Sequence, residues 1–471
     1  MAKALIDAGY AVTVVALRAP VQQLRDMCPQ VEYLSVTPRP VTARLLARGS
    51  RSERTRSCSS DSGGRSAFAR ALRLATFPVW SAKAVRRVAI IAPFTLVLKK
   101  SNESFAEAWR AAAADSTLTT LSRFGGQLHQ WALTHAFAKA ADKATRGRRF
   151  DVVQAHDNYA IVAAARLAAR DRAKLVYDAV ELSSHRLALD LSRLEALRER
   201  CERREEAAIF RKADLMLAVG DGVANWYARS YAIDRPLVVR NCRYYWEYRA
   251  DGRLRADAGL ADTTRVVVWS GSAYPQQGLE LLIDAVPFMP PHIHVAIVAT
   301  ALPRWTTYLN DLLPQRAAAL GVADRTHFLP AQEPNDLVPY ISGADLGVIP
   351  RPSEHLNNFL SMPNKFLEMV MARLPVAVSR VGDMAEAVAR HGIGAVFDER
   401  DPANMAAVLE GMLAPAAYRE LKANVMTAAQ EMTWERESVA YISAIGALVP
   451  TPAIAAPVSR PAAAAASRSP P

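Results

Sequence analysis

The segment Ser361–Glu368 (Ser-Met-Pro-Asn-Lys-Phe-Leu-Glu) carries residue types that could bind an anion. Pro363 suits the first turn of a helix, which leaves Ser361 and the neighbouring backbone amides free to face a ligand. Lys365 and Glu368 share one helix face; the ammonium suits a diphosphate and the carboxylate suits ribose hydroxyls. The alternative is an ordinary surface pair worth about 0.2–0.5 kcal/mol. The ligand-binding residues predicted here are Ser361, Met362, Asn364, Lys365 and Glu368.

A second segment, Ser270–Gly278 (Ser-Gly-Ser-Ala-Tyr-Pro-Gln-Gln-Gly), joins an apolar run to a predicted helix. Gly271 permits a ligand to approach the backbone closely, and Gly278 opens a helix whose amino end could hold phosphate. The same residues also fit an ordinary turn between a strand and a helix, so both interpretations stay open. The ligand-binding residues predicted here are Gly271, Ser272, Gln277 and Gly278.

Alternating strands and helices must position both segments. In the first half we expect strands at Asp151–Ala155, Lys174–Ala179, Leu215–Val219 and Pro236–Val239. In the second half we expect strands at Arg265–Ser270, His294–Val298, Thr326–Phe328, Leu346–Ile349 and Val376–Ser379, with helices between them. This order favours parallel sheets, whose ligands bind beyond the carboxyl ends of the strands. The prediction is an α/β fold of two facing Rossmann-like domains with a cleft between them.

The amino terminus departs from that pattern. Met1–Gly9 is predicted to be a helix and Tyr10–Leu17 a strand. A doubly wound domain normally begins with a strand before such a helix, so the first domain is expected to lack its first strand. A chain that starts late and a domain that is truly shortened are equally compatible with this pattern.

The predicted organisation has four parts. They are a first domain over 1–238 with a basic insertion at about 41–149, a second domain over 239–430, a helix over 431–448 that crosses back to the first domain, and a disordered Pro/Ala tail over 449–471.

Composition excludes several classes. Hydrophobic residues make up 51% of the 471 residues and charged residues 22%, which rules out a disordered or collagen-like chain. The four cysteines form no C-x-x-C pair, so neither a zinc ribbon nor a redox motif is present, and a reducing cytoplasm fits this usage. The longest apolar run near the basic region, Val88–Leu98, is far shorter than the ~20 residues that span a membrane.

Positive charge is concentrated in one part of the chain. Residues 41–100 hold 13 Lys or Arg against two acidic residues, while the whole chain has a net charge of +12. In Ala84–Lys100 basic residues bracket an apolar core, which predicts peripheral contact with an anionic membrane surface. A loop and a helix packed on the first domain would give the same sequence pattern. No aromatic platform accompanies the arginines, so nucleic acid is not expected.

Several motifs together resemble a known family. The runs Val266–Ala285, Ile341–Pro350 and Ser361–Ser379 look like the donor domain of GT-B fold glycosyltransferases of the family-4-like, group 1 type. Asp151–Asp157, Leu175–Leu182 and Ala213–Gly222 fit the first domain of that family. The resemblance covers residues 1–40 and 150–445, and it implies a GT-B fold.

The resemblance also assigns roles to residues. It makes Glu368 the ribose ligand, but Leu360 stands where the family has a first glutamate, and Val180 where it has a histidine. Ser272 and Gln277 occupy positions that are usually basic and neutralise the departing diphosphate. The cations that could replace them are Lys365, Arg304 and Arg351, of which Arg351 is the best placed. For catalysis we predict His156 and Glu181, with His185 as another histidine that could reach the cleft.

The function implied is transfer of a hexose from a nucleoside-diphosphate sugar with retained configuration, without a cofactor or metal ion. The expected acceptor is a glycan or lipid-linked molecule in cell-surface polysaccharide synthesis, with the protein cytoplasmic or peripheral at the inner membrane face. The replacements at Leu360, Val180, Ser272 and Gln277 also fit a non-catalytic scaffold subunit. A GT-B epimerase is the third possibility.

Overall fold

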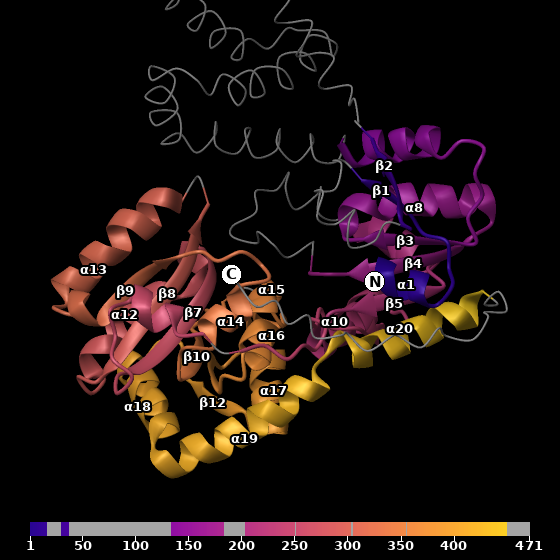
Figure 1. Cartoon of the computed structure of the whole chain (residues 1–471). Coiled ribbons are helices and arrows are strands. Elements are labelled where there is room, and N and C mark those ends of the chain that lie inside the picture. The colour runs from indigo at the N-terminus through magenta and orange to yellow at the C-terminus, as the bar shows by residue number, and fades with distance from the viewer. Residues whose placement is uncertain are drawn as a thin grey trace, which may run out of the picture.

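The computed structural model describes residues 1–16, 30–36, 133–182, 203–249, 251–302, 305–354 and 356–449. These residues form two α/β domains, each built on a parallel sheet, and a helix that returns from the second domain to the first (Figure 1). Over the described ranges, no helix is long and apolar enough to cross a bilayer. The predicted basic surface at Ala84–Lys100 and the tail beyond residue 449 lie outside them.

The second domain contains a six-stranded parallel sheet in the order β12-β11-β10-β7-β8-β9. Its strands are β7 Arg265–Ala273, β8 Ile293–Ala301, β9 Thr326–Pro330, β10 Leu346–Ile349, β11 Val376–Ser379 and β12 Gly394–Phe397. Every residue of β10 and β11 is buried, because helices cover both faces of the sheet. The carboxyl ends of β7, β10 and β11 are therefore neighbours along one edge.

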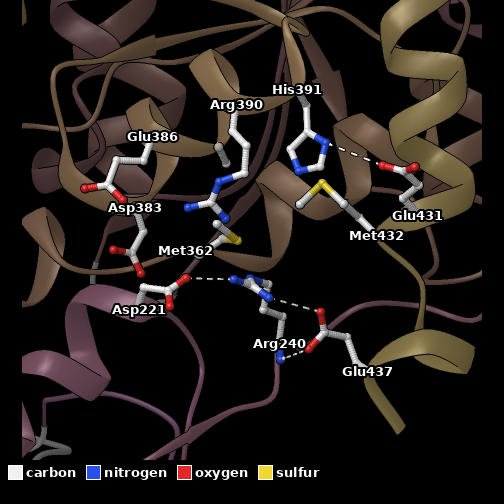
Figure 2. A pocket seen from close by; sticks show the side chains of 11 residues that line it. Asp221, Arg240, Met362, Asp383, Glu386, Arg390, His391, Glu431, Met432 and Glu437 are labelled. Atoms are coloured by element: carbon white, nitrogen blue, oxygen red, sulfur yellow. Dashed lines mark hydrogen bonds and ion pairs between the residues drawn. The ribbon is translucent and has the colours of Figure 1, made fainter. Parts of the chain in front are cut away.

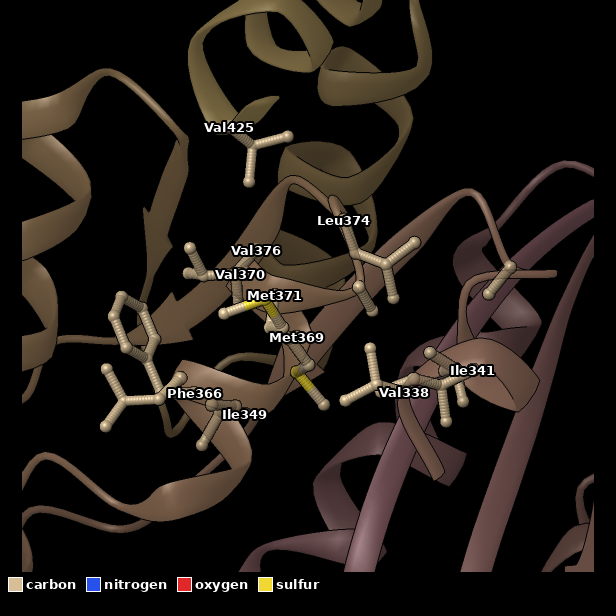
Figure 3. Close-up of a cluster of buried hydrophobic side chains, with 14 of the residues drawn as sticks. Val338, Ile341, Ile349, Phe366, Met369, Val370, Met371, Leu374, Val376 and Val425 are labelled. Atoms are coloured by element: carbon tan, nitrogen blue, oxygen red, sulfur yellow. The ribbon is translucent and has the colours of Figure 1, made fainter. Parts of the chain in front are cut away.

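Helices of the second domain connect these strands. They are α11 Arg253–Asp257, α12 Leu279–Ala285, α13 Leu313–Ala319, α14 Leu337–Ile341, α15 Leu356–Phe359, α16 Asn364–Met371, α17 Gly382–His391, α18 Pro402–Leu413 and α19 Pro415–Glu431. Phe366, Met369 and Val370 of α16 are buried against α14, β10 and Val425 of α19 (Figure 3). This packing fixes the helix that carries the predicted ligand-binding residues.

The first domain has a four-stranded parallel sheet, β3-β4-β5-β6, and a separate parallel pair, β1-β2. Its elements are α1 Ala2–Asp7, β1 Thr13–Ala16, β2 Glu32–Ser35, β3 Val152–His156, α8 Asn158–Asp171, β4 Lys174–Ala179, β5 Leu215–Ala218, α10 Asp221–Tyr231 and β6 Leu237–Val238. The first described element of this domain is α1, and the helix and strand predicted for the amino terminus are present as α1 and β1.

Most predicted elements are present, with differences at their ends. The strands predicted at Lys174–Ala179, Leu346–Ile349 and Val376–Ser379 have the predicted bounds. The helix predicted between the strands at His294–Val298 and Thr326–Phe328 contains a π-helical turn, Tyr308–Leu312, before α13. The elements that pattern analysis missed are β2, α10, α11, α15, α17 and β12. Two of these, β2 and β12, are short strands that are only partly buried, so they lack the continuous apolar run that marked β10 and β11.

The carboxyl-terminal helix α20, Trp434–Leu448, packs on the first domain. Its buried Trp434, Tyr441 and Ile445 contact the cluster formed by Val176, Leu217 and Val239. The Tyr441 Oη donates a hydrogen bond of 2.7 Å to Gln154 Oε1 on β3. The helix thus fastens the end of the described chain to the four-stranded sheet of the first domain.

We expect Tyr441→Phe to lower the free energy of unfolding by about 1 kcal/mol, because it removes this hydrogen bond and leaves Gln154 without its donor. Urea denaturation measures the change. Val439→Ala on the same helix is the control, because the Val439 side chain is 67% exposed. Equal stability of the two variants would show that the Tyr441 contact does not hold α20.

Candidate functional site

The predicted ligand-binding segments meet at the carboxyl edge of the second sheet. Since β7 pairs with β10 and β10 with β11, the segments after these strands lie side by side. Part of the predicted loop is strand: β7 extends to Ala273, so Gly271 and Ser272 belong to it. Only Tyr274 and the short turn Pro275–Gln277 separate β7 from Gly278. The site is thus built on a rigid strand end.

Lys365, in the first turn of α16, is the centre of this edge. Its Nζ lies 4.1 Å from the centroid of the Trp269 ring and donates a hydrogen bond to Gln277 Oε1. A Cβ placed on Gly271 would come within 3.2 Å of the same Nζ, so the glycine makes room for the ammonium. Burial and the nearby Arg351 lower the pKa of Lys365 to about 7.

Arg351 supplies a second cation two residues after β10. Its Nη1 donates to Ser361 Oγ at 2.7 Å, and its Nε is buried without a hydrogen-bond partner among the described residues. The amide Nδ2 of Asn358 is also buried and has no partner there. Burial lowers the pKa of Arg351, while the charges of Tyr274 and Glu181 oppose that shift.

The two cations together make a candidate anion site. In the part of the chain that the structure describes, neither Lys365 nor Arg351 forms an ion pair, and their charges repel each other. A half-buried cation without a counter-charge is unfavourable, so a ligand that brings negative charge is stabilised here. Two cations and two unpaired donors suit a diphosphate.

The remaining predicted residues of the second domain have different surroundings. Gly278 has φ of 72°, and a Cβ there would meet Pro350 O at 1.7 Å, so its role is close packing. Ser272 and Asn364 are exposed beside the cations. Pro363 is the cap of α16, one position before the first turn, and Met362 is buried away from the group around Lys365.

Glu368 lies one turn after Lys365 and is already paired. Its Oε1 accepts a hydrogen bond of 2.6 Å from Nη2 of Arg243, and the Glu368 side chain is 14% exposed. Arg243 belongs to the connector between the domains and also donates to Pro334 O at 3.0 Å. Sequence reasoning missed Arg243, because no motif marks a contact across 125 residues.

The first domain contributes His156 at the end of β3. Its Nδ1 lies 2.8 Å from Oδ2 of Asp178, the residue directly opposite on β4. Asp178 is 3% exposed, whereas the His156 side chain is 57% exposed. A buried carboxylate therefore orients an accessible imidazole, with Nδ1 as donor, while Nε2 lies 3.4 Å from Gln154 Nε2. Sequence reasoning missed Asp178; the strand register places it.

The two domains touch at the site. The Leu182 N–H, one residue after Glu181, donates to Asn357 Oδ1 of α15 at 3.0 Å. Leu360, which replaces the family's first glutamate, packs on the core of the first domain and against Gly222. The Leu360 side chain therefore forms part of the contact between the two domains. Of the other residues considered, Arg304 and His185 lie outside the described ranges.

Asp383, at the start of α17, makes a second contact between the domains. Both of its carboxylate oxygens accept from the Gly222 N–H, at 2.8 and 3.1 Å, near the amino end of α10. A Cβ on Gly220 would lie 2.1 Å from Asp383 Oδ2, so the glycines permit this approach. Burial raises the pKa of Asp383 to about 6.

A cavity of about 150 Å³ lies beside this contact and is distinct from the anion site (Figure 2). Arg240 bridges Asp221 at 2.8 Å and Glu437 at 3.2 Å across it, and Met362 lines it. Its charged side chains largely pair with one another, so the cavity marks a polar junction between the domains. Over the described residues no cluster of three His, Cys, Asp or Glu could hold a metal ion.

Comparison with known proteins agrees with this architecture. Residues 264–414 match the family model described as "Glycosyl transferases group 1". The D-inositol 3-phosphate glycosyltransferase of Geodermatophilus obscurus is 30% identical over 200 residues, which cover 40% of this chain and 42% of that protein. The protein of the same name from Acidothermus cellulolyticus is 28% identical over 190 residues, 39% and 41% of the two chains. The chain thus spans less than half of these relatives' length.

Two solved structures share the fold. A glycosyltransferase from Rickettsia africae has a TM-score of 0.59 at 10% identity, covering 96% of this chain and 95% of that one. Anabaena Alr3699/HepE, solved with UDP and glucose, has a TM-score of 0.55 at 20% identity, covering 68% and 83%. The fold is GT-B, and the resemblance to group 1 glycosyltransferases is confirmed over residues 264–414.

The anion site predicts pH-dependent binding of inorganic pyrophosphate. The pKa of Lys365 is about 7 in the free protein, so the ammonium is present below pH 7 and is lost as the pH rises. A bound anion raises that pKa, so affinity should weaken above pH 7 while binding takes up a proton. Calorimetry in two buffers of different ionisation enthalpy measures both effects.

Lys365→Met should weaken pyrophosphate binding at pH 6.5 by about tenfold or more, which corresponds to one lost charged hydrogen bond. Lys422→Met is the matched control: burial also lowers the pKa of Lys422, but its Nζ donates to Arg373 O at 2.7 Å. If the pyrophosphate affinity does not depend on pH and is the same in the wild type and Lys365→Met, Lys365 does not bind the anion.

Proposed function

We propose that this protein is a glycosyltransferase that moves a hexose from a nucleoside-diphosphate sugar to an acceptor hydroxyl. The observation that carries the proposal is the pair Lys365 and Arg351, two cations that form no ion pair in the described structure. Lys365 lies one helical turn before Glu368. The match of residues 264–414 to glycosyltransferases of group 1 supports it.

The cations would bind the diphosphate and stabilise its charge as it leaves. The sequence lacks the basic residues that the family resemblance leads one to expect at Ser272 and Gln277. In the structure Gln277 instead holds the Lys365 ammonium from α16, and Arg351 approaches from the loop after β10. Preorganised positive charge at a leaving group is among the largest contributions to catalysis.

Glu368 would bind the ribose hydroxyls of the donor. Its carboxylate holds Arg243 in the ligand-free protein, so a bound ribose would replace or share that hydrogen bond. Alr3699/HepE was solved in complex with UDP and glucose, which makes UDP the first nucleotide to test here.

His156 would contact the acceptor hydroxyl or the transferred sugar. The buried Asp178 fixes its orientation, and the charge of Glu181, from the loop after β4, acts on Arg351. Retention of anomeric configuration is part of this proposal and rests on the family resemblance. Proton NMR of the product's anomeric signal tests it.

The proposed acceptor is a glycan or lipid-linked molecule in cell-surface polysaccharide synthesis, reached at an anionic inner membrane face. The curated relatives carry the name D-inositol 3-phosphate glycosyltransferase, but the match spans less than half of their length. The acceptor panel should therefore include inositol phosphate beside lipid-linked sugars. The donor is proposed to be used without a metal ion, which a comparison of activity with and without chelator tests.

A non-catalytic scaffold is the second candidate, and Leu360 favours it. This side chain replaces a family carboxylate and packs between the domains. Thermal shift with UDP, GDP and ADP, followed by an assay of nucleotide release from the matching sugars, separates the two candidates. Stabilisation with release supports the transferase; stabilisation by none of the nucleotides supports the scaffold.

Glu368→Gln should weaken UDP binding by about tenfold, because a neutral amide accepts ribose hydrogen bonds less strongly than a carboxylate. Pyrophosphate binding should be unchanged, since the ribose is absent. Glu437→Gln is the matched control. Glu437 also pairs with an arginine and is 15% exposed, but it lines the separate cavity beside Asp383. Equal UDP affinity in the wild type and Glu368→Gln, measured by calorimetry, would exclude the ribose role.

His156→Asn should lower kcat by about 10²-fold at unchanged UDP affinity, which is the scale of a lost proton-transfer or hydrogen-bonding group. Asp178→Asn should lower it too, and the double variant should be no slower than the slower single one, because the two act as a unit. The control is His292→Asn, an exposed histidine at the start of β8. A changed UDP affinity with an unchanged kcat would contradict this role.

A further inference from the structure

We propose that Gln154 and Tyr441 are positioning residues for His156, and that they leave its Nε2 as a hydrogen-bond acceptor for a hydroxyl group. Together with Asp178 these side chains form a continuous series of hydrogen bonds from α20 through β3 to β4, here called the His156 network. The role in catalysis rests on the proposed function, whereas the position of the proton on the imidazole does not.

Strand pairing and α20 bring the network together. Gln154 and His156 are two residues apart on β3, so their side chains project from the same face of the sheet. Asp178 lies opposite His156 on β4, and Val176 lies opposite Gln154. Helix α20 covers this face, because Tyr441 packs in one cluster with Val176 (Figure 1). The carboxyl-terminal helix therefore lies next to the residues that hold the histidine.

The Tyr441 hydroxyl is the first donor of the network. Its Oη lies 2.7 Å from Gln154 Oε1, and Tyr441 is fully buried. Burial and the charge of Asp178 raise the pKa of Tyr441, so the hydroxyl keeps its proton. A buried hydroxyl proton requires an acceptor, and the carbonyl oxygen of the Gln154 amide supplies it.

The orientation of the Gln154 amide follows from its neighbours. Its Nε2 lies 3.2 Å from Met1 Sδ and 3.4 Å from His156 Nε2. A thioether sulfur only accepts hydrogen bonds, so the amide NH2 faces Met1 and the amide oxygen faces Tyr441. The NH2 group has two protons, one for the sulfur and one for the imidazole. Gln154 therefore presents a donor to His156 Nε2.

Asp178 fixes the other side of the imidazole ring. Its Oδ2 lies 2.8 Å from His156 Nδ1, and Asp178 is 3% exposed. The second oxygen, Oδ1, is buried and has no hydrogen-bond partner within the described ranges. A buried carboxylate with so few donors is unfavourable unless Nδ1 carries a proton, so we assign the proton to Nδ1.

The two contacts of the ring select one protonation state. The proton that a neutral imidazole carries on one nitrogen is set by the hydrogen bond that the other nitrogen makes. In the His156 network Nδ1–H donates to Asp178 and Nε2 accepts from Gln154, so every bond has one donor and one acceptor. The network thus specifies the Nδ1–H tautomer.

A ligand at Nε2 of His156 must therefore bring a donor. The His156 side chain is 57% exposed, and the 3.4 Å contact with Gln154 is longer than a strong hydrogen bond, so a ligand can replace it. A hydroxyl group donates to Nε2, whereas an ester or carbonyl oxygen has no proton to give. In the proposed transferase, His156 would accept from the acceptor hydroxyl, and Gln154 would hold the ring until that hydroxyl binds.

Nitrogen NMR of the full ligand-free protein, labelled with ¹⁵N in histidine, observes the imidazole protons directly. At pH 8 we expect His156 Nδ1 to be protonated and Nε2 to be bare, with the His156→Asn spectrum identifying the signals. Gln154→Leu removes the donor, so the Nε2 signal should move toward that of a nitrogen without a hydrogen bond. Gln154→Glu offers the ring only acceptors, so both nitrogens should be protonated at the same pH.

Tyr441→Phe tests the far end of the network. It frees the Gln154 amide, so the His156 Nε2 signal should move in the same direction as in Gln154→Leu, but less far. Tyr340→Phe is the matched control, because Tyr340 is equally buried and its Oη donates to Asp257 Oδ2 at 2.7 Å in the second domain. This control loses the same kind of bond and should leave the His156 signals unchanged.

Kinetics test the role in catalysis. Gln154→Leu should lower kcat about tenfold at unchanged UDP affinity, which is part of the roughly 10²-fold or more that a proton-transfer group contributes. Gln430→Leu is the control, because Gln430 is exposed on α19. An equal kcat in Gln154→Leu and the wild type would exclude a positioning role in turnover.

A wild-type His156 with a protonated Nε2 and a bare Nδ1 would overturn the inference. His156 signals that are the same in the wild type, Gln154→Leu and Tyr441→Phe would overturn it as well. The spectra use no nucleotide, so they decide the tautomer whether or not the protein transfers a sugar. Spectra as expected in a protein that transfers no sugar would count against the proposed function and not against the His156 network.

Discussion

Two like charges, Lys365 and Arg351, half-buried and unpaired in the described structure, constrain the rest of this molecule. Holding them together without a counter-ion is unfavourable, and several features reduce the cost. The Trp269 ring faces the ammonium, Gln277 accepts its hydrogen bond, and Ser361 accepts from the guanidinium. The strand ends that carry these groups are among the most deeply buried parts of the fold. The arrangement is built for an anion that arrives as a ligand.

The structure also reinterprets the departures from the family pattern. In the sequence, Ser272 and Gln277 look like lost cations and Leu360 like a lost carboxylate. In three dimensions Gln277 holds a lysine from another helix, and Leu360 joins the two domains next to Gly222. The positive charge at this edge comes from Lys365 of α16 and Arg351 of the loop after β10. Loss of motif residues is therefore not by itself an argument for loss of activity here.

Much of the fold could be predicted because local signals were strong. Buried parallel strands such as Lys174–Ala179 and Val376–Ser379 read as apolar runs between breakers, and their bounds were correct. Short, partly buried strands such as β2 and β12 lack that continuous apolar run, and the role of the glycines at the start of α10, Gly220 and Gly222, appears only where the domains meet. The pairing partners of Asp178 and Arg243 depend on register and on connector geometry, which no local pattern encodes.

The sequence alone determined the α/β class, the two parallel sheets and the helix that carries Lys365 and Glu368, because periodicity and helix chemistry are local properties. The tertiary structure alone decided which charges are neighbours: Arg351 beside Lys365, Arg243 on Glu368, Asp178 behind His156, Asp383 across the domain boundary. Electrostatic energy depends on distance and burial, and residues far apart along a chain acquire both only when the chain has folded.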